Sequence, residues 1–266
     1  MPIIDLLFTR LFYETNGEGD AVVLIPGFAS GAWSWSWQAK YLAKDLSVVT
    51  FDPRGISRSV AEAGVKVTIP QLAEDISVLL DALEIASANI LGISFGGFVA
   101  QEFAVRFPER VDRLVLASTS FGGPNHIMPS AEVLEPFSAA DGLNSSEKIR
   151  RHLQSAFMPE FIKEKPEEVD LFCRLREENH VPEAIYNQQL AAAYEFNIED
   201  AVGSITARTL VVTGARDTVV PKQNSINLAS NIPNSRLEII EEAGHMVFIE
   251  KAGEFNKLVV DFLTEE

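Results

Sequence analysis

Short apolar runs rich in β-branched residues recur along the chain, and segments with helical periodicity lie between them. The runs cover residues 21–25, 47–51, 89–93, 114–117, 209–213 and 236–240. Continuous apolar runs of this length suit strands that are covered on both faces, as in parallel sheets. Helices between such strands form the crossovers that parallel pairing requires. The alternation therefore predicts an α/β fold with a mostly parallel central sheet and helices on both faces.

The clearest helical patterns lie between these runs. Residues 69–83 carry leucine and isoleucine at helical spacing, and residues 98–107 form a second amphipathic segment that Pro108 ends. At the N-terminus, residues 6–14 alternate like a strand and are followed by N-G-E-G. This pattern predicts a strand and turn of an opening antiparallel hairpin.

One region departs from the alternation. From about residue 121 to residue 205 no convincing strand occurs, but helical patterns do, and they cover residues 145–157, 167–178 and 182–194. Such a span is too long for an ordinary loop. We therefore expect a core domain made of residues 1–120 and 206–266, with residues 121–205 inserted as a helical cap between two core strands.

Composition narrows the class of protein. The chain has 266 residues, 47% of them hydrophobic, which suffices for a large core. Its 22 Lys and Arg against 38 Asp and Glu give a net charge of −16, which disfavours nucleic acid and anionic membranes as partners. No apolar stretch approaches the roughly 18 residues of a membrane span. We expect a cytoplasmic location, because Cys173 has no second cysteine to pair with and no secretory leader is recognisable. The oligomeric state is left open.

The stretch Gly92-Ile93-Ser94-Phe95-Gly96 follows a predicted buried strand and precedes a predicted helix. A G-x-S-x-G sequence in this setting is typical of a nucleophile elbow, in which the serine adopts a strained backbone conformation and its neighbours must lack a Cβ. The alternative is that the glycines only allow close packing, since short matches also occur by chance. A serine nucleophile needs a base and an orienting acid, so the two interpretations differ in what else the chain must contain.

Candidates for both partners follow later strands. The chain has four histidines: His126, His152, His180 and His245. The first three lie in the predicted cap, where a solvated histidine is the simpler interpretation. His245 follows a predicted strand and the turn E-E-A-G, at the carboxyl edge of the sheet. Asp217 follows a strand that ends in glycine, and its alternative role is to cap a turn or helix. The order Ser94, Asp217, His245 is the order of the triad in α/β-hydrolases.

The chain resembles the α/β-hydrolase superfamily over essentially its full length. The resemblance rests on P-G-F at 26–28, D-P-R-G-I-S-R-S at 52–59, the elbow, the G-A-R-D loop and the A-G-H turn. Two positions depart from the family pattern: Pro26 stands where the family often has His, and Ser57 where it often has Gly. Since proline has a fixed φ, we expect a rigid oxyanion loop with altered geometry.

The resemblance implies a mechanism and its residues. Ser94 would attack an acyl carbon, His245 would accept its proton, and Asp217 would orient the imidazole. The backbone N–H groups of Phe28 and Phe95 would form the oxyanion hole. No metal or organic cofactor is called for.

The serine at the elbow also limits the substrates, because haloalkane dehalogenases and epoxide hydrolases of this fold use an aspartate there. The sequence is most similar to carboxylesterases and 3-oxoadipate enol-lactonases. Our first expectation is a serine hydrolase that cleaves an ester of a small, mainly apolar acyl group. A lactonase or a hydrolase of carbon–carbon bonds in aromatic degradation is the alternative. A slow-turnover, ligand-sensing protein is an alternative of another class.

Pocket residues are harder to predict. We expect Trp33, Phe137, Phe157 and Met246 to line the substrate pocket, and one of the tryptophans Trp33, Trp35 and Trp37 to pack in the core. The cap arginines are Arg150, Arg151, Arg174 and Arg176. Nothing distinguishes any of them from a solvated helix charge, which weakens the enol-lactonase alternative.

Overall fold

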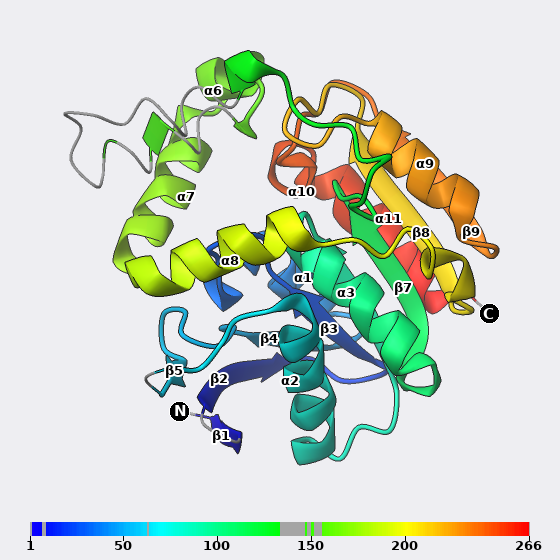
Figure 1. Cartoon of the computed structure of the whole chain (residues 1–266). Helices are drawn as coiled ribbons and strands as arrows, with labels where there is room; N and C mark the ends of the chain where they lie inside the picture. Colours follow the sequence, from blue (N-terminus) through cyan, green and yellow to red (C-terminus); the bar gives the residue numbers. More distant parts are fainter. Residues whose placement is uncertain are drawn as a thin grey trace.

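The computed structural model describes residues 2–6, 9–62, 64–133, 147, 150–151 and 156–265. Its centre is a nine-stranded sheet of order β1-β2-β4-β3-β6-β7-β8-β9, with β5 paired to β2 (Figure 1). The strands are β1 (Ile3–Leu6), β2 (Thr9–Asn16), β3 (Ala21–Ile25), β4 (Ser47–Phe51), β5 (Val60–Ala61), β6 (Ala88–Ile93), β7 (Val111–Ala117), β8 (Arg208–Gly214) and β9 (Ser235–Ile240). Pairing is parallel from β4 through β9 and antiparallel at β1, β2 and β5.

Helices cover both faces of the sheet. They are α1 (Ala39–Leu42), α2 (Ile69–Ala82), α3 (Phe95–Arg106), α6 (Pro159–Glu164), α7 (Pro166–Glu178), α8 (Glu183–Glu195), α9 (Gln223–Asn231), α10 (Val247–Glu250) and α11 (Ala252–Thr264), with 3-10 turns η1 (Ala32–Trp35), η2 (Pro108–Arg110) and η3 (Val202–Ser204). Along β3, Val23 and Ile25 belong to the cluster that includes α2, α3 and α9, whereas Val22 and Leu24 pack with α1 and α11. Because successive strand residues point to opposite faces, these clusters are the two layers of the core. The predicted α/β fold with a mostly parallel sheet is confirmed.

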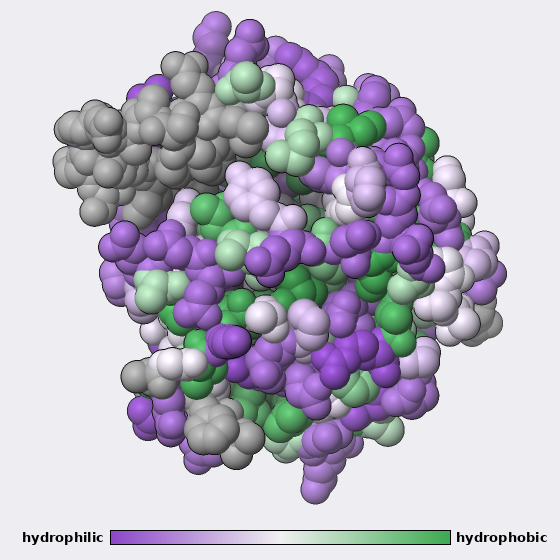
Figure 2. Space-filling view, in the orientation of Figure 1, coloured by the Kyte–Doolittle hydropathy of each residue, from purple (hydrophilic) through white to green (hydrophobic). Residues whose placement is uncertain are grey.

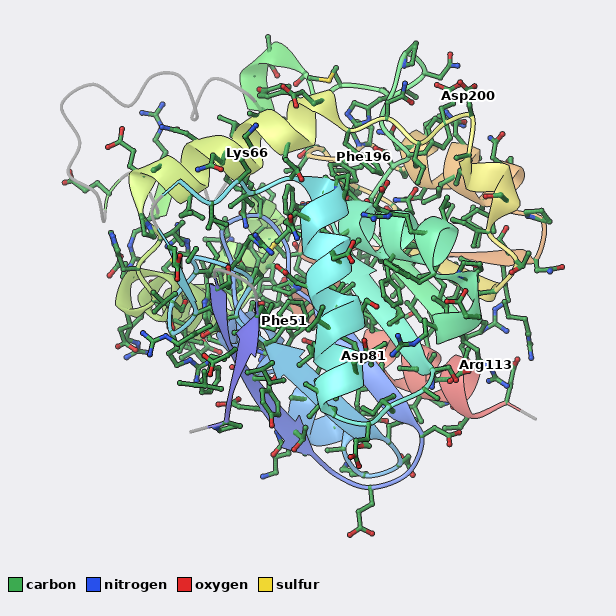
Figure 3. The ribbon with its side chains drawn as sticks, turned by 60° about the horizontal axis from the view of Figure 1, so that its bottom comes forward. Phe51, Lys66, Asp81, Arg113, Phe196 and Asp200 are labelled. Carbon is green, nitrogen blue, oxygen red and sulfur yellow. The ribbon has the colours of Figure 1, made fainter. Side chains whose placement is uncertain are left out.

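In Figure 3, α2 lies in front of the sheet, with Asp81 near its end. Hydrophilic residues cover most of the face in Figure 2, as the charge of the chain leads one to expect. Within the ranges the structure describes, no helix combines the length and the hydrophobicity needed to cross a membrane.

The N-terminal strand differs in its partners from the simplest hairpin. β2 pairs antiparallel with β1 and with β4, and not with β3 across the N-G-E-G turn. The reason is that both edges of β3 are taken by parallel partners, β4 and β6. The turn therefore joins β2 to β3 across the end of β4, which lies between them in the sheet.

Between β7 and β8 the described residues form helices α6, α7 and α8, which we call the cap helices, and one isolated bridge from Gly122 to Asn197. Figure 1 shows α7 and α8 on the upper side of the sheet. The predicted helix over residues 145–157 falls mostly outside the described residues. The domain boundaries at residues 120 and 206 stay a prediction.

A buried ion pair joins the loop after β4 to α2. Arg54 Nε donates to Asp75 Oδ2 at 2.7 Å, and Arg54 Nη2 makes a second bond to Asp75 Oδ1. Both side chains are only 4% exposed. The neighbouring Asp52 accepts the N–H of Ala32 at 2.8 Å and pairs with Arg58 at 2.7 Å. The D-P-R-G motif thus anchors a helix on one side and the loop after β3 on the other.

Replacing one partner of the buried pair leaves an uncompensated charge. We expect Asp75→Asn to lower the free energy of unfolding by about 3–5 kcal/mol, and Arg54→Met with Asp75→Leu to lower it by much less, because no unpaired charge then stays buried. Urea unfolding of the wild type and the two variants measures this. A double variant less stable than the single one would contradict it.

Candidate active site

The turn between β6 and α3 holds Ser94 in a strained conformation. Its φ is 52° and its ψ is −119°, outside the regions that L-residues ordinarily occupy. A Cβ on Gly92 would lie 2.3 Å from the carbonyl oxygen of Gly96, and a Cβ on Gly96 would lie 2.3 Å from that of Ile25. The glycines around the serine are therefore required by the approach of β6, α3 and β3, and the turn has the form of a nucleophile elbow.

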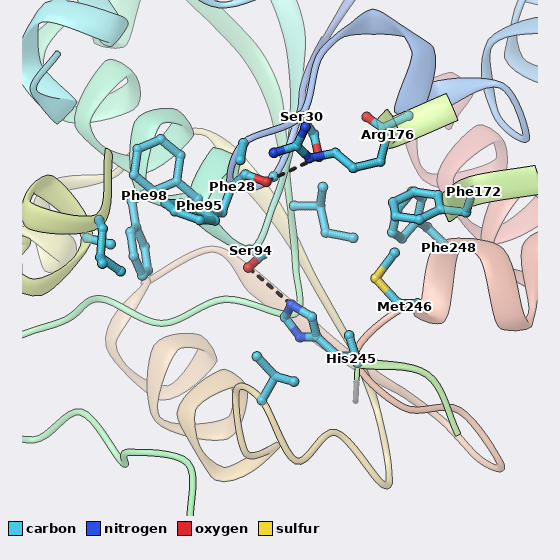
Figure 4. A pocket seen from close by; sticks show the side chains of 18 of the residues that line it. Phe28, Ser30, Ser94, Phe95, Phe98, Phe172, Arg176, His245, Met246 and Phe248 are labelled. Carbon is cyan, nitrogen blue, oxygen red and sulfur yellow. Dashed lines mark hydrogen bonds between the residues drawn. The ribbon is translucent and has the colours of Figure 1, made fainter. Parts of the chain in front are cut away.

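Three side chains from three loops meet at this turn. His245 Nε2 lies 3.1 Å from Ser94 Oγ (Figure 4). On the other side of the ring, His245 Nδ1 lies 2.9 Å from Asp217 Oδ2. The other carboxylate oxygen of Asp217 accepts the N–H groups of Val219 and Val220 at 3.0 and 2.8 Å. Asp217 and His245 are buried. This arrangement can take a proton from the serine hydroxyl and hold the resulting imidazolium.

The charge around His245 favours its protonated form. Burial by itself lowers the pKa of the imidazole, but the negative charge and hydrogen bond of Asp217, together with the charge of Glu250, outweigh it. The pKa of His245 is therefore raised above its ordinary value. A histidine of this kind is a stronger base for the serine proton, and it is active as a base only at pH values above its own pKa.

Glu250 is a second buried carboxylate close to the histidine. Its oxygens accept the N–H of Gly244 at 2.7 Å and the N–H of Met158 at 3.2 Å. Burial raises the pKa of Glu250, while these hydrogen bonds and the proximity of His245 oppose the rise. The side chain therefore ties the loop that carries His245 to the residue before α6. Sequence analysis did not single out Glu250, and no signal beyond a carboxylate near the histidine points to it.

Two backbone N–H groups accompany the serine. Phe28 and Phe95 line the same pocket as Ser94. Within the described part of the chain, neither N–H has a backbone or side-chain acceptor. Free N–H groups beside a nucleophile can stabilise a negative oxygen.

The pocket in front of Ser94 has a volume of about 310 Å³. Its walls are largely apolar and include Phe28, Phe95, Phe98, Phe172, Met246 and Phe248. Among its polar residues are Ser30, Ser34, Tyr186 and Arg176. A pocket of this kind suits a small, mostly apolar molecule with a polar or charged end.

The structure places the predicted pocket residues in different surroundings. Met246 lines the pocket. Trp33 does not: it is buried against Phe172, with ring centroids 5.1 Å apart. Phe157 lines the neighbouring cavity beside Asp217 instead. Phe137 lies outside the described residues.

Trp33 does not reach the pocket because it belongs to η1, a 3-10 turn in which all four residues are buried. Its indole packs between the core and α7. Trp35 is fully buried against Phe248 and packs in the core. Ser34, between them, is the tryptophan-rich segment's contribution to the pocket.

Sequence analysis named Arg176 but did not distinguish it from the other cap arginines. It lines the pocket, whereas Arg174 on the same helix is exposed and Arg150 pairs with Asp170. Its guanidinium donates to the carbonyl of Asn179 at 3.1 Å, and no ion pair joins it to a carboxylate of the described residues. Burial lowers the pKa of its guanidinium. A partly desolvated cation without a counter-ion favours an anionic ligand.

A signal for Arg176 exists in the sequence. The buried residues of α7 are Val169, Phe172 and Cys173, and Arg176 continues this stripe at helical spacing. A cation on the inward face of a helix is the pattern that distinguishes it from a solvated charge. Among the described residues, no group of three His, Cys, Asp or Glu side chains is arranged so that it could hold a metal ion.

Glu250 provides a test of the electrostatics. We expect Glu250→Gln to shift the acidic limb of the activity–pH profile to lower pH, because loss of a negative charge lowers the pKa of His245, whose neutral form is needed. The measurement is kcat/KM against pH for an activated ester. Glu254→Gln, at an exposed position of α11, is the control and should leave the limb in place. An unmoved limb in both variants would refute the assignment.

Comparison with known proteins identifies the family. A model of the alpha/beta hydrolase fold matches residues 20–252. The 2-hydroxymuconate semialdehyde hydrolase of Pseudomonas sp. (strain CF600) is 32% identical over 96% of this chain and 91% of that protein. The 2-hydroxy-6-oxo-6-phenylhexa-2,4-dienoate hydrolase of Comamonas testosteroni is 28% identical over 98% and 93% of the two chains. Among solved structures, the enol-lactonase from Burkholderia xenovorans LB400 has a TM-score of 0.86 and 27% identity, covering 99% of this chain and 100% of that one. This chain belongs to the α/β-hydrolase fold family.

Proposed function

We propose that this hydrolase cleaves a carbon–carbon bond beside a ketone in a small substrate that carries a carboxylate. The observation that carries the proposal is Arg176, a partly buried cation in an otherwise largely apolar pocket that also contains Ser94. The similar hydrolases act, by their names, on 2-hydroxymuconate semialdehyde and on a 2-hydroxy-6-oxo dienoate. Our first expectation, a simple carboxylic ester, has less support than this alternative.

The first chemical step is the same for every bond considered. His245 takes the proton of Ser94 as the hydroxyl oxygen attacks the carbonyl carbon, and Asp217 stabilises the imidazolium. The backbone N–H groups of Phe28 and Phe95 hold the developing oxyanion. Their lack of other acceptors in the described residues means that no existing hydrogen bond has to break.

The second step decides which bond is cleaved. When the tetrahedral intermediate collapses, the carbon–carbon bond breaks and its electron pair goes to the leaving carbon, where His245 returns the proton. A carbon leaving group needs conjugation with a carbonyl to take up these electrons as an enol or enolate. A 2-hydroxy dienoate must therefore first move the proton of its 2-hydroxyl group to the carbon beside the ketone, which gives the 2-keto form that can leave as an enolate. Arg176 supports this step by binding the carboxylate of the leaving fragment and placing it in the pocket. Water, activated by His245, then releases the acyl group from Ser94.

A lactone that carries a carboxylate is the second candidate. It is favoured by the likeness to the enol-lactonase from Burkholderia xenovorans LB400, which extends over nearly the whole of both chains. Such a substrate would use Arg176 in the same way. The difference is that the leaving oxygen stays attached to the acyl fragment.

Time courses on three substrates distinguish a carbon–carbon bond hydrolase from a lactonase and from an esterase. We expect sustained turnover of 2-hydroxy-6-oxo-6-phenylhexa-2,4-dienoate, with a higher kcat/KM than for an enol-lactone or p-nitrophenyl butyrate. Ser94→Ala should lower it by at least about 10³-fold, because the nucleophile is lost. Higher kcat/KM with the lactone would favour the second candidate. A single burst without further turnover on all three would contradict both and favour a ligand-sensing protein.

The role of Arg176 has its own test. We expect Arg176→Met to lower kcat/KM about 10²–10³-fold for the dienoate, because a desolvated charge pair is lost, and to leave its neutral methyl ester nearly unaffected. Arg174→Met, on the exposed face of the same helix, is the control and should change neither value. Equal losses for the acid and the methyl ester would show that Arg176 does not bind a carboxylate.

A further inference from the structure

A side chain of the cap helices reaches the loop that carries Phe28. Gln189 lies on α8 and is only 1% exposed. Its Oε1 accepts the N–H of Ala29 at 2.8 Å, although the two residues are 160 positions apart in the sequence. The acceptor is buried and therefore not interchangeable with water, so its loss would leave the Ala29 N–H unpaired.

Residues 27–30 form a tight turn whose shape is unusual for its sequence. The N–H of Ser30 donates to the carbonyl of Gly27 at 3.2 Å, and Ala29, the third residue, has a φ of 52°. The backbone φ of Phe28 is not positive, so this is the pattern of a type II turn. Such a turn strongly prefers glycine at the third position. Alanine there favours a type I turn instead, because its Cβ is crowded at positive φ.

The two turn types differ by a flip of the peptide that joins Phe28 to Ala29. That peptide is held from both sides. Its N–H donates to Gln189, and its carbonyl accepts the hydroxyl of Ser30 at 3.2 Å. Residue 26 gives no such support, because proline has neither an N–H nor a polar side chain. Gln189 therefore supplies the hydrogen bond that selects the strained orientation.

We propose that Gln189 is a positioning residue of the oxyanion hole. It holds the 27–30 turn in the type II form, so that the N–H of Phe28 stays aimed at the oxygen that forms when Ser94 attacks. The inference rests on the proposed role of Ser94 and its oxyanion hole, but not on the identity of the bond cleaved. It makes α8 a part of the catalytic geometry as well as a wall of the pocket.

The chain offers closely matched variants. Gln189→Met removes the acceptor and keeps the length of the side chain, whereas Gln189→Glu keeps an oxygen acceptor. Gln188→Met is the control. Gln188 also accepts a backbone N–H from a core loop, that of Val67 at 2.8 Å, but this loop lines a different cavity.

Two measurements report on the hole. One is kcat/KM for p-nitrophenyl butyrate, and the other is the Kd of butane-1-boronic acid, whose tetrahedral adduct with the serine places an oxygen in the hole. We expect Gln189→Met to weaken both by a similar factor of about 10- to 100-fold, because a small misplacement of a donor is costly in the transition state. Gln189→Glu, which keeps an oxygen acceptor but buries a carboxylate, should lose less of both values than Gln189→Met. Gln188→Met should leave both near wild type even where its Tm falls.

Wild-type kcat/KM and boronate affinity in Gln189→Met would overturn the proposal. So would equal losses in Gln188→Met, since they would point to general docking of α8. If Gln189→Met does not fold, Gln189→Asn, which is shorter by one methylene, replaces it with the same expected loss. Unchanged boronate affinity in Ser94→Ala would refute the role of Ser94 and this inference with it. Failure to cleave the dienoate refutes only the proposed substrate.

Discussion

The strained backbone of Ser94, with its positive φ, is the constraint on which the site depends. It is possible only because β6 and α3 meet at Gly92 and Gly96, with the carbonyl of Ile25 directly against the second glycine. The strain is offset by the packing of two buried strands and a helix. In return the hydroxyl stands clear of the chain at the carboxyl edge of the sheet, where the loops after β8 and β9 bring Asp217 and His245 to it.

Polar contacts in buried places connect the cap helices to this edge. Glu250 joins the histidine loop to the residue before α6, and Gln189 joins α8 to the turn at Ala29. Both contacts end on backbone N–H groups, so they set the positions of loops rather than of side chains. The site is therefore assembled from the loops of the sheet and the cap helices together, and Arg176 adds a cation that pairs with no carboxylate of the described residues.

Much of this was predictable because it depends on local pattern. The apolar runs predicted β3 and β4 with their observed bounds, since a strand covered on both faces has little choice of residue. Ser94, Asp217 and His245 were predictable as neighbours because the ends of parallel strands share one edge. The partners of β2 were not, since pairing depends on which strand edges are already occupied.

The amino-acid sequence by itself determined the α/β architecture, the elbow and the three residues that meet there, because each follows from hydrophobic period, glycine placement or strand order. Only the tertiary structure decided which side chains face the pocket. Arg174 and Arg176 are about 200° apart on a helix, so just one can point inward, and the packing of α7 chooses it. In the same way, Trp33 packs against Phe172, and Gln189 accepts the N–H of Ala29. Contacts between distant segments, not local preference, fix these two side chains.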